Sequence, residues 1–214
     1  MKSIVLLSGG LDSAVMLYMC LREGWKPLCL SFRYGQRHGR ELECARRLAA
    51  LNSLEHLVMD LPEIFQSALT GVGNIPPSFD RSIVVPLRNY LFLTFAAAVC
   101  EQRDISDIFI GVTAEDEDFP DCRWEALDKL EEALRLGGFN LSNLKIHTPL
   151  IGMTKVEIVK VGLELGVPFH LTWSCYAGGS RPCGGCLACQ KRMNAFKALK
   201  VEDPIERGGE TSLL

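Results

Sequence analysis

The segment Lys2-Ser3-Ile4-Val5-Leu6-Leu7-Ser8-Gly9-Gly10-Leu11-Asp12-Ser13 decides the fold class. Residues 2–7 form a short apolar run of the kind found in buried strands. The two glycines that follow predict a turn, and residues 14–22 have the pattern of a helix that ends at Gly24. A strand that passes through a glycine turn into a helix is the first unit of a parallel α/β sheet.

Strands and helices continue to alternate along the chain. Four further strands are expected at residues 27–32, 56–59, 108–112 and 145–147. Five further helices are expected at residues 36–51, 89–103, 121–136, 154–165 and 190–200. This order predicts a Rossmann-like parallel sheet with helices on both faces, whose ligands bind beyond the carboxyl ends of the strands. For the glycine- and proline-rich residues 61–86 we favour a loop that covers the site over a disordered segment.

The composition describes a folded domain without membrane or nucleic-acid signals. Of 214 residues, 48% are hydrophobic and the formal net charge is −3, which excludes an intrinsically disordered chain. No apolar run reaches 18 residues, and the N-terminus lacks the apolar region and cleavage site of a signal peptide. We therefore expect a soluble cytoplasmic protein that does not bind membranes. The slight acidity also disfavours bulk binding of nucleic acid.

The nine cysteines fall into two groups. Five are scattered through the chain and are expected to be small buried hydrophobic residues: Cys20, Cys29, Cys44, Cys100 and Cys122. The other four, Cys175, Cys183, Cys186 and Cys189, have the spacing C-x7-C-x2-C-x2-C with glycines between them. Four thiolates so close in sequence predict a tetrahedral structural zinc site, with an iron–sulfur cluster or free thiols as alternatives. A shell of four thiolates leaves no open position, so this zinc is not expected to be catalytic.

The turn after the first strand is a candidate phosphate site. The backbone N–H groups of residues 10–13 open a helix, and the N-terminal end of a helix favours anions. The hydroxyl groups of Ser8 and Ser13 can add hydrogen bonds. The loop lacks the lysine of a Walker motif and the spacing of the G-x-G-x-x-G dinucleotide motif. Taken locally, it is equally a tight turn that Asp12 or Ser13 caps.

The hexamer of residues 8–13 is similar to the S-G-G-x-D-S motif of the PP-loop ATP pyrophosphatases, which have HUP-like adenine-nucleotide-binding domains. This resemblance implies that ATP binds with its pyrophosphate in the loop and that its α-phosphate is the electrophile. The nucleotide-binding residues that it implies are Leu7, Ser8, Gly9, Gly10, Leu11, Asp12, Ser13 and Ala14.

Further segments, in order along nearly the whole chain, resemble the QueC-like 7-cyano-7-deazaguanine synthases of queuosine biosynthesis. They are Tyr34-Gly35-Gln36-Arg37-His38, Val85-Pro86-Leu87-Arg88-Asn89, Pro120-Asp121-Cys122-Arg123, Thr148-Pro149-Leu150, Lys155-Val156-Glu157-Ile158-Val159, Thr172-Trp173-Ser174-Cys175-Tyr176 and Cys183-Gly184-Gly185-Cys186-Leu187-Ala188-Cys189. The resemblance implies an ATP-dependent ligase that converts 7-carboxy-7-deazaguanine and ammonia into the nitrile. The acid and then the amide are adenylated, and AMP and pyrophosphate are released.

The same resemblance implies the cofactors and the organisation of the chain. Mg²⁺ accompanies ATP, one structural zinc is bound per chain, and the partners are small-molecule substrates. We expect a PP-loop domain at residues 1–170 and a zinc-binding segment with the C-terminal helix at residues 171–214. The oligomeric state does not follow from the sequence, and a homodimer stays open.

The implied chemistry suggests roles for several polar residues, each with a local alternative. Asp12 and Ser13 would orient Mg²⁺ or the pyrophosphate, or cap the first helix. Arg88 would bind a phosphate or the substrate carboxylate as a bidentate fork, or lie on the surface near a helix start. Lys155 would neutralise pyrophosphate, or be a solvated lysine in the first turn of a helix.

The remaining candidates lie in or near the expected base pocket. Asp121 would hold the guanine-like edge of the base, or cap the helix expected at residues 121–136. Arg123 would pair with Asp116 or with a phosphate, and Asp116 itself is either a metal or base contact or part of a solvated acidic run. Asn89 is functional or a helix cap. For His38 a packed or surface position is favoured over an acid–base role.

Three departures from the resemblance leave other functions open. Arg33 stands where the similar proteins commonly have Asp, Leu87 replaces a small residue, and the stretch before Pro120 is one residue shorter with Phe119 in place of Tyr. They motivate an offshoot that transfers the adenylated deazaguanine to another acceptor, such as a protein amine. A tRNA-thiolating PP-loop enzyme would need an RNA-binding surface and reactive cysteines, which this acidic chain does not offer. A non-catalytic, zinc-stabilised interaction protein would not need an intact phosphate loop.

Overall fold

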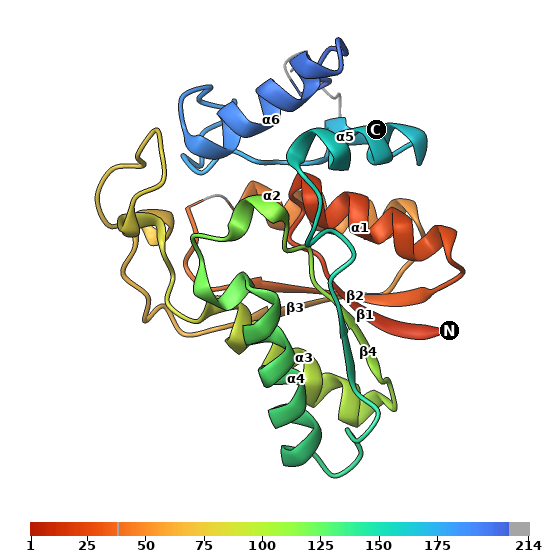
Figure 1. Ribbon diagram of the computed structural model, residues 1–214. Helices are drawn as coiled ribbons and strands as arrows, with labels where there is room; N and C mark the ends of the chain where they lie inside the picture. The colour runs from red at the N-terminus through yellow and green to blue at the C-terminus, as the bar shows by residue number, and fades with distance from the viewer. Residues whose placement is uncertain (38, 206–214) are drawn as a thin grey trace.

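The computed structural model describes residues 1–37 and 39–205, and a five-stranded parallel sheet lies at its centre (Figure 1). The strands lie in the order β3-β2-β1-β4-β5. Their bounds are Lys2–Leu6 (β1), Lys26–Arg33 (β2), His56–Asp60 (β3), Asp107–Phe109 (β4) and Lys145–His147 (β5). The parallel α/β sheet predicted from the sequence is therefore confirmed. The strand order reverses between β1 and β4, which is where such sheets bind ligands.

The described residues contain six α-helices, five of which cover the two faces of the sheet. They are α1 (Leu11–Arg22), α2 (Arg40–Leu51), α3 (Arg88–Arg103), α4 (Trp124–Gly137), α5 (Lys155–Glu164) and α6 (Leu187–Ala198). Figure 1 shows α1, α2 and α5 on one side of the sheet with α6 stacked on α5, and α3 and α4 on the other side.

The alternating side chains of β1 build both layers of the core. Ile4 and Leu6 point into the cluster that contains α3, whereas Val5 and Leu7 point into the cluster that contains α1, α2 and α5. All four are at most 8% exposed. Because both faces of the sheet are covered here, the stretch from Ile4 to Leu7 is continuously apolar. Each such buried side chain supplies about 1.5–3 kcal/mol relative to its exposed state.

Two predicted helices begin later than expected. The helix expected from residue 36 begins at Arg40, because the side chain of Gln36 turns back to accept from the Tyr34 N–H (2.8 Å) and donate to the Phe32 carbonyl (2.9 Å). The helix expected from residue 121 begins at Trp124, because Pro120–Cys122 form a separate 3₁₀ turn. Competing local hydrogen bonds therefore displace helix starts that the apolar pattern places too early.

Other boundaries shift by one to three residues. The first helix begins at Leu11 instead of residue 14, and the last spans Leu187–Ala198 instead of residues 190–200. The fourth strand ends at Phe109, before residue 112. The extra apolar residues after Phe109 remain buried, so hydrophobicity alone did not distinguish strand from buried loop.

Residues 61–86 are packed against the core. They contain two 3₁₀ turns, Ala68–Thr70 and Arg81–Ile83. Leu69, Ile83 and Val85 are buried and line the cavity described below, as expected for a segment that covers a site. In Figure 1 this segment forms the yellow loop at the left edge.

One segment of the described residues, Arg81–Arg103, is long and apolar enough by composition to cross a membrane. The sequence expectation of no such stretch is thus met only in part. The continuous helix within it is α3, whose 16 residues extend about 24 Å and fall short of a hydrocarbon core of about 30 Å. Leu93, Ala96 and Cys100 of α3 are buried in the core. A buried core helix meets the same criterion, so the signal is weak.

The C-terminal segment packs through α6 against α5 and the residues that follow it. The ring of Phe196 packs edge-on against Phe169 with centroids 5.3 Å apart. Arg192 is buried, and its guanidinium forms a bidentate pair with Asp203 at 2.7 and 2.9 Å. The same group donates to the Thr172 hydroxyl (2.7 Å) and to the Phe169 carbonyl (3.0 Å). A buried arginine is stable only when its donors are satisfied in this way.

Candidate active site and metal centre

The loop between β1 and α1 presents the start of a helix without a side-chain cap. Gly10 is the N-cap residue of α1, so the alternative that Asp12 or Ser13 caps this helix is wrong. The Ser8 hydroxyl accepts from the Gly10 N–H at 3.1 Å and lies 3.0 Å from the Ser13 hydroxyl. Ser13 also donates to the Gly10 carbonyl at 3.2 Å. The loop is thus braced internally while the first N–H groups of α1 have no partner within the helix.

Gly9 serves a packing role that the sequence did not reveal. Its φ is +88°, and a Cβ placed there would lie 1.9 Å from the carbonyl oxygen of Glu41 in α2. The Gly9 carbonyl accepts from the Trp173 N–H at 3.0 Å, just before the cysteine segment. The glycine therefore admits the backbone of α2, and the C-terminal segment holds the loop from the other side.

A cavity of about 280 Å³ opens beyond the carboxyl ends of β1, β2 and β4. Its lining residues form two groups by chemistry. The first, termed the polar end, consists of Ser8, Gly10, Asp12, Ser13, Lys155, Ser174, Lys191 and Arg192. The second, termed the aromatic end, consists of aromatic and apolar residues together with three polar ones: Tyr34, Ile83, Val85, Arg88, Asn89, Phe92, Phe119, Asp121 and Tyr176. A cavity that combines charged and aromatic groups suits a ligand that has both a charged part and a flat apolar part.

Lys155 and Asp12 meet at the polar end although 143 positions separate them. The Lys155 Nζ lies 2.5 and 2.6 Å from the two carboxylate oxygens of Asp12. The two side chains are 14% and 29% exposed, so the alternative of a solvated lysine is wrong. Lys155 is the first residue of α5, whose N-cap is Thr154. The N-terminal ends of α1 and α5 therefore face the same cavity, with a lysine between them.

Arg88 opens α3 and lies half-buried in the cavity wall, so the surface alternative for this residue is wrong. Its Nη1 donates to the Tyr34 hydroxyl at 3.5 Å. Burial raises the pKa of Tyr34, which keeps this hydroxyl protonated. Arg88 therefore directs a permanent positive charge into the aromatic end of the cavity.

Asp121 caps a different helix from the one expected. Its carboxylate accepts from the Asn89 backbone N–H at 2.9 Å, in the first turn of α3, whereas α4 has no side-chain cap. Asn89 is not a cap either: its side-chain amide donates to the Cys122 sulfur at 3.1 Å. Burial raises the pKa of Cys122 to about 12, so its thiol is neutral. These contacts fix the Pro120–Cys122 turn against α3.

Arg123 and Asp116 do not form the expected ion pair. The Arg123 guanidinium donates twice to the Glu117 carbonyl at 3.2 Å, and the residue is absent from the cavity lining. Asp116 lines the cavity, and one of its carboxylate oxygens accepts from the N–H and hydroxyl of Thr113 at 2.9 and 2.8 Å. Glu115 and Asp116 therefore belong to a capped turn, whereas Glu117 and Asp118 are exposed, so the solvated alternative holds for the second half of the acidic run. His38 lies outside the described residues.

Glu115 and Lys191 are site residues that the sequence analysis missed. Lys191 Nζ lies 3.2 Å from the Glu115 carboxylate, whose other oxygen accepts from the Lys155 N–H at 2.7 Å. Burial raises the pKa of Glu115, but the hydrogen bonds from Lys155 and Lys191 lower it overall. The sequence offered one signal for Lys191, which is its position two residues after Cys189. This signal could be used only once the location of the cysteine segment beside the cavity was known.

Two of the three departures noted in the sequence lie outside the cavity lining. Arg33 forms an exposed ion pair with Asp60 at 2.7 Å. Leu87 is the exposed residue before α3, with φ +53°. Phe119 does line the cavity, and its ring meets Phe79 edge-on at 5.4 Å. Arg33 and Leu87 therefore do not alter the cavity, whereas the shortened stretch before Pro120 contributes Asp116 and Phe119 to its lining.

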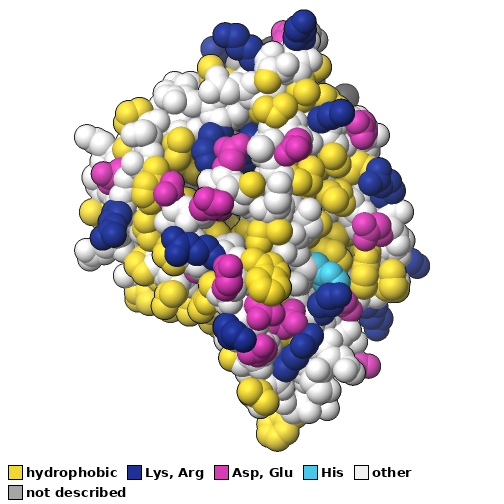
Figure 2. Space-filling model, in the orientation of Figure 1, with side chains coloured by type: hydrophobic (Ala, Val, Ile, Leu, Met, Phe, Trp, Pro, Cys, Tyr) yellow, Lys and Arg dark blue, Asp and Glu magenta, His cyan; other side chains and the backbone are white. Residues whose placement is uncertain are grey.

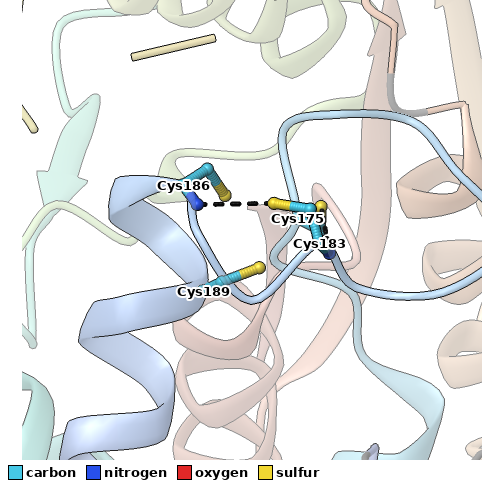
Figure 3. A group of neighbouring side chains, drawn as sticks. All are labelled: Cys175, Cys183, Cys186 and Cys189. Atoms are coloured by element: carbon cyan, nitrogen blue, oxygen red, sulfur yellow. Dashed lines mark hydrogen bonds between the residues drawn. The ribbon is translucent and has the colours of Figure 1, made fainter. Parts of the chain in front are cut away.

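The four clustered cysteines converge on one point. Their sulfur atoms all lie within 4.8 Å of one another, and Figure 3 shows Cys186 and Cys189 at the start of α6 facing Cys175 and Cys183. A tetrahedron of Zn–S bonds of about 2.3 Å has S–S edges of about 3.8 Å, so the residues fit a metal of this size. Cys183 N–H donates to the Cys175 sulfur, and Cys186 N–H to the Cys183 sulfur, both at 3.3 Å.

The electrostatics of the cluster favour a metal-binding thiolate. The hydrogen bond from Cys189, followed by backbone N–H groups, lowers the pKa of Cys186 to about 5. The same contact raises the pKa of Cys189. The contact therefore favours the thiolate form of Cys186, which is the form that binds metals. Figure 2 shows acidic and basic side chains mixed over the visible face, without an extended patch of one sign.

Comparison with known proteins places the chain among enzymes of one kind. The profile of the family described as queuosine biosynthesis protein QueC matches residues 2–200. The 7-cyano-7-deazaguanine synthase of Thermoplasma acidophilum is 41% identical over 96% of this chain and 91% of its own length. The 7-cyano-7-deazaguanine synthase of Trichodesmium erythraeum is 42% identical over 96% of this chain and its own full length.

Solved structures share the fold at low sequence identity. NMN synthetase from Francisella tularensis superposes with a TM-score of 0.53 and 17% identity, covering 99% of this chain and 78% of that chain. The U34-tRNA thiolase NcsA from Methanococcus maripaludis, solved with its [4Fe-4S] cluster, has a TM-score of 0.50 and 15% identity, covering 100% and 78%. At these identities the likeness extends to the fold alone.

Proposed function

The chain belongs to the family of queuosine biosynthesis protein QueC, and from this premise we propose that it is a 7-cyano-7-deazaguanine synthase. It is an ATP-dependent ligase that joins 7-carboxy-7-deazaguanine and ammonia into the nitrile. The observation that carries the proposal is the Ser8–Ser13 loop, which lines a cavity whose walls also include Tyr34, Phe92 and Tyr176. The similar proteins are named as synthases, and Arg33 and Leu87 lie outside the cavity, which supports the synthase over the offshoot with another acceptor.

The reaction needs one ATP for each oxygen that is removed. The substrate carboxylate attacks the α-phosphorus, the bond to pyrophosphate breaks, and an acyl adenylate forms. Ammonia displaces AMP to give the amide. The amide oxygen then attacks the α-phosphorus of a second ATP, the bond to pyrophosphate breaks, and loss of AMP with the two protons of the amide nitrogen leaves the nitrile. Holding these groups in line accounts for much of such a rate acceleration.

The loop and the lysine would serve the phosphate end. The N–H groups at the start of α1, together with the Ser8 and Ser13 hydroxyls, are suited to bind pyrophosphate. Lys155 would neutralise the leaving pyrophosphate, and Asp12 would orient this lysine and the Mg²⁺ that accompanies ATP. Mg²⁺ offsets phosphate charge when it is bound. The 2.5–2.6 Å contacts between Lys155 and Asp12 support this pairing of roles.

The aromatic end would hold the base. Arg88 would bind the carboxylate of the acid substrate as a bidentate fork, which neutralises it and aims it at ATP. Asp121 carries one hydrogen bond from Asn89 and would offer its other lone pairs to the amino and ring N–H groups of the base. Arg123 has no part in this arrangement because its donors are engaged by the Glu117 carbonyl.

The cysteine cluster would hold structural zinc rather than an iron–sulfur cluster. Four thiolates with convergent sulfur atoms fill a tetrahedral shell and leave no position for substrate. We assign residues 1–170 to the nucleotide domain and residues 171–214 to the metal-binding segment with its helix. The partners would be small molecules rather than nucleic acid or membrane, and the protein soluble and cytoplasmic. A homodimer stays open.

Analysis of the nucleotide products tests the proposal. With ATP, ammonium and 7-carboxy-7-deazaguanine, we expect two AMP and two pyrophosphate per nitrile, with the amide accumulating when ATP is limiting. Ser13→Ala should lose most turnover while remaining folded, as a cooperative thermal transition would show, whereas Ser142→Ala, at an exposed position, should have no effect. ADP as the main product would refute attack on the α-phosphorus. AMP without nitrile would refute this choice of acceptor.

A further inference from the structure

A chain of polar contacts connects α6, which carries two of the cysteines, to the nucleotide end of the cavity. Lys191 lies five residues into α6, and its Nζ donates to the Glu115 carbonyl at 3.1 Å and lies 3.2 Å from the Glu115 carboxylate. Lys191 lines the cavity, and both side chains are about one-third exposed, at 30% and 29%. Lys191 therefore contacts both the backbone and the side chain of Glu115, in the turn after β4.

The Glu115 carboxylate in turn holds the first residue of α5 in place. The second carboxylate oxygen of Glu115 accepts from the Lys155 backbone N–H at 2.7 Å. This N–H is among those that a helix leaves without an internal partner, and a negative charge is favourable there. Lys155 then extends to Asp12 in α1. A displacement of Glu115 would shift the first turn of α5 and with it the ammonium group of Lys155.

We propose that Lys191 is a positioning residue for the ATP site, which acts through Glu115 to set the place of Lys155. This rests on the proposed function, in which Lys155 and Asp12 face the pyrophosphate. Cys186 is the N-cap of α6 and Cys189 lies in its first turn, so the cysteine cluster fixes the base from which Lys191 extends. The metal-binding segment thereby contributes to nucleotide binding through a side chain of its own helix.

A plain ion pair at this exposure would contribute little. Exposed pairs are worth at most about 1 kcal/mol and are screened by salt. The contact matters here because Glu115 is shared, and loss of one partner of a shared network alters the geometry of the others. Lys191→Met should therefore weaken nucleotide binding by about tenfold, in the range seen for residues coupled through one network.

The first experiment measures the affinity of the zinc-loaded protein for α,β-methylene-ATP, which cannot lose pyrophosphate, by titration calorimetry. We expect Lys191→Met to raise Kd about tenfold, and Lys191→Arg to restore most of the affinity. Lys197→Met, at an exposed position of the same helix, should match wild type. Zinc content and melting temperature should be unchanged. In turnover, KM for ATP should rise while KM for 7-carboxy-7-deazaguanine stays constant.

Glu115→Gln distinguishes positioning from direct contact between Lys191 and phosphate. If Lys191 acts through Glu115, then Lys191→Met, Glu115→Gln and the double variant should all lose the same affinity for the analogue. Loss in Lys191→Met with unchanged or tighter binding in Glu115→Gln would overturn the proposal, because Lys191 would then contact ATP directly. Wild-type affinity in Lys191→Met would also overturn it. If the wild-type protein did not bind the analogue, the proposed function itself would fall and this proposal with it.

Discussion

Replacing Gly9 by alanine tests whether the phosphate loop depends on close approach of α2. A Cβ at Gly9 would lie 1.9 Å from the Glu41 carbonyl oxygen and 2.7 Å from the Ala45 backbone nitrogen. Both are backbone atoms, so relief requires a movement of α2 as a unit. Gly24 is the matched control, because its φ of +83° is nearly the same as the +88° of Gly9 and nothing lies within 4 Å of a Cβ there.

The two variants separate strain from steric overlap. A left-handed conformation costs a non-glycine residue about 1–2 kcal/mol, and this applies to both alanines. Overpacking adds about 1–3 kcal/mol at Gly9 alone. We therefore expect Gly24→Ala to lower the free energy of unfolding by ~1–2 kcal/mol and Gly9→Ala by ~2–5 kcal/mol. Gly9→Ala should also weaken ATP binding. A shift of the loop would disturb the bond from the Trp173 N–H to the Gly9 carbonyl and displace the neighbouring N–H groups that are proposed to bind phosphate.

Denaturant unfolding of the zinc-loaded protein measures the stability change, and calorimetry with the ATP analogue measures the binding change. Equal midpoints for the two variants would show that α2 does not approach the loop as described. A destabilised Gly9→Ala variant that binds the analogue normally would show that the loop conformation is independent of α2. The first result would refute the packing role of Gly9, and the second would refute the link between this packing and nucleotide binding.

Three further predictions concern other parts of the molecule. Leu87→Gly should raise the free energy of unfolding by ~0.5–1 kcal/mol, since Leu87 is exposed with φ +53°, and an unchanged denaturation midpoint would contradict this. Cys186→Ala should lose the one zinc per chain while Cys44→Ala, beside the cluster, keeps it; metal analysis decides, and iron in the wild-type protein would argue against zinc. Burial, with the Arg46 charge, lowers the pKa of His56, so the unfolded chain binds its proton more readily and stability should fall as pH drops below 6.5. Denaturation midpoints at pH 7.5 and 5 should differ less in His56→Gln, and an equal difference would refute this source of pH dependence.

Most of the element order could be predicted from short-range patterns. The Gly9-Gly10 turn between an apolar run and a helix, and the tetrad of cysteines within 15 residues, were readable because the residues concerned are neighbours along the chain. Helix starts were less accurate. Gln36 folds back onto Phe32, and Pro120–Cys122 form their own turn, and such hydrogen bonds outweigh the apolar period that placed these helices earlier.

The sequence by itself determined a parallel sheet, a phosphate loop at its centre and a cysteine site for a metal, because each of these depends on residues within a few positions of one another. Only the tertiary structure decided that Lys155 meets Asp12 and that Asp121 caps α3 rather than α4. The strand order β3-β2-β1-β4-β5 brings β4 beside β1, so the turns that follow these strands share one edge. Pairings across that edge join residues far apart in the chain, and no local pattern records which polar side chain will face which.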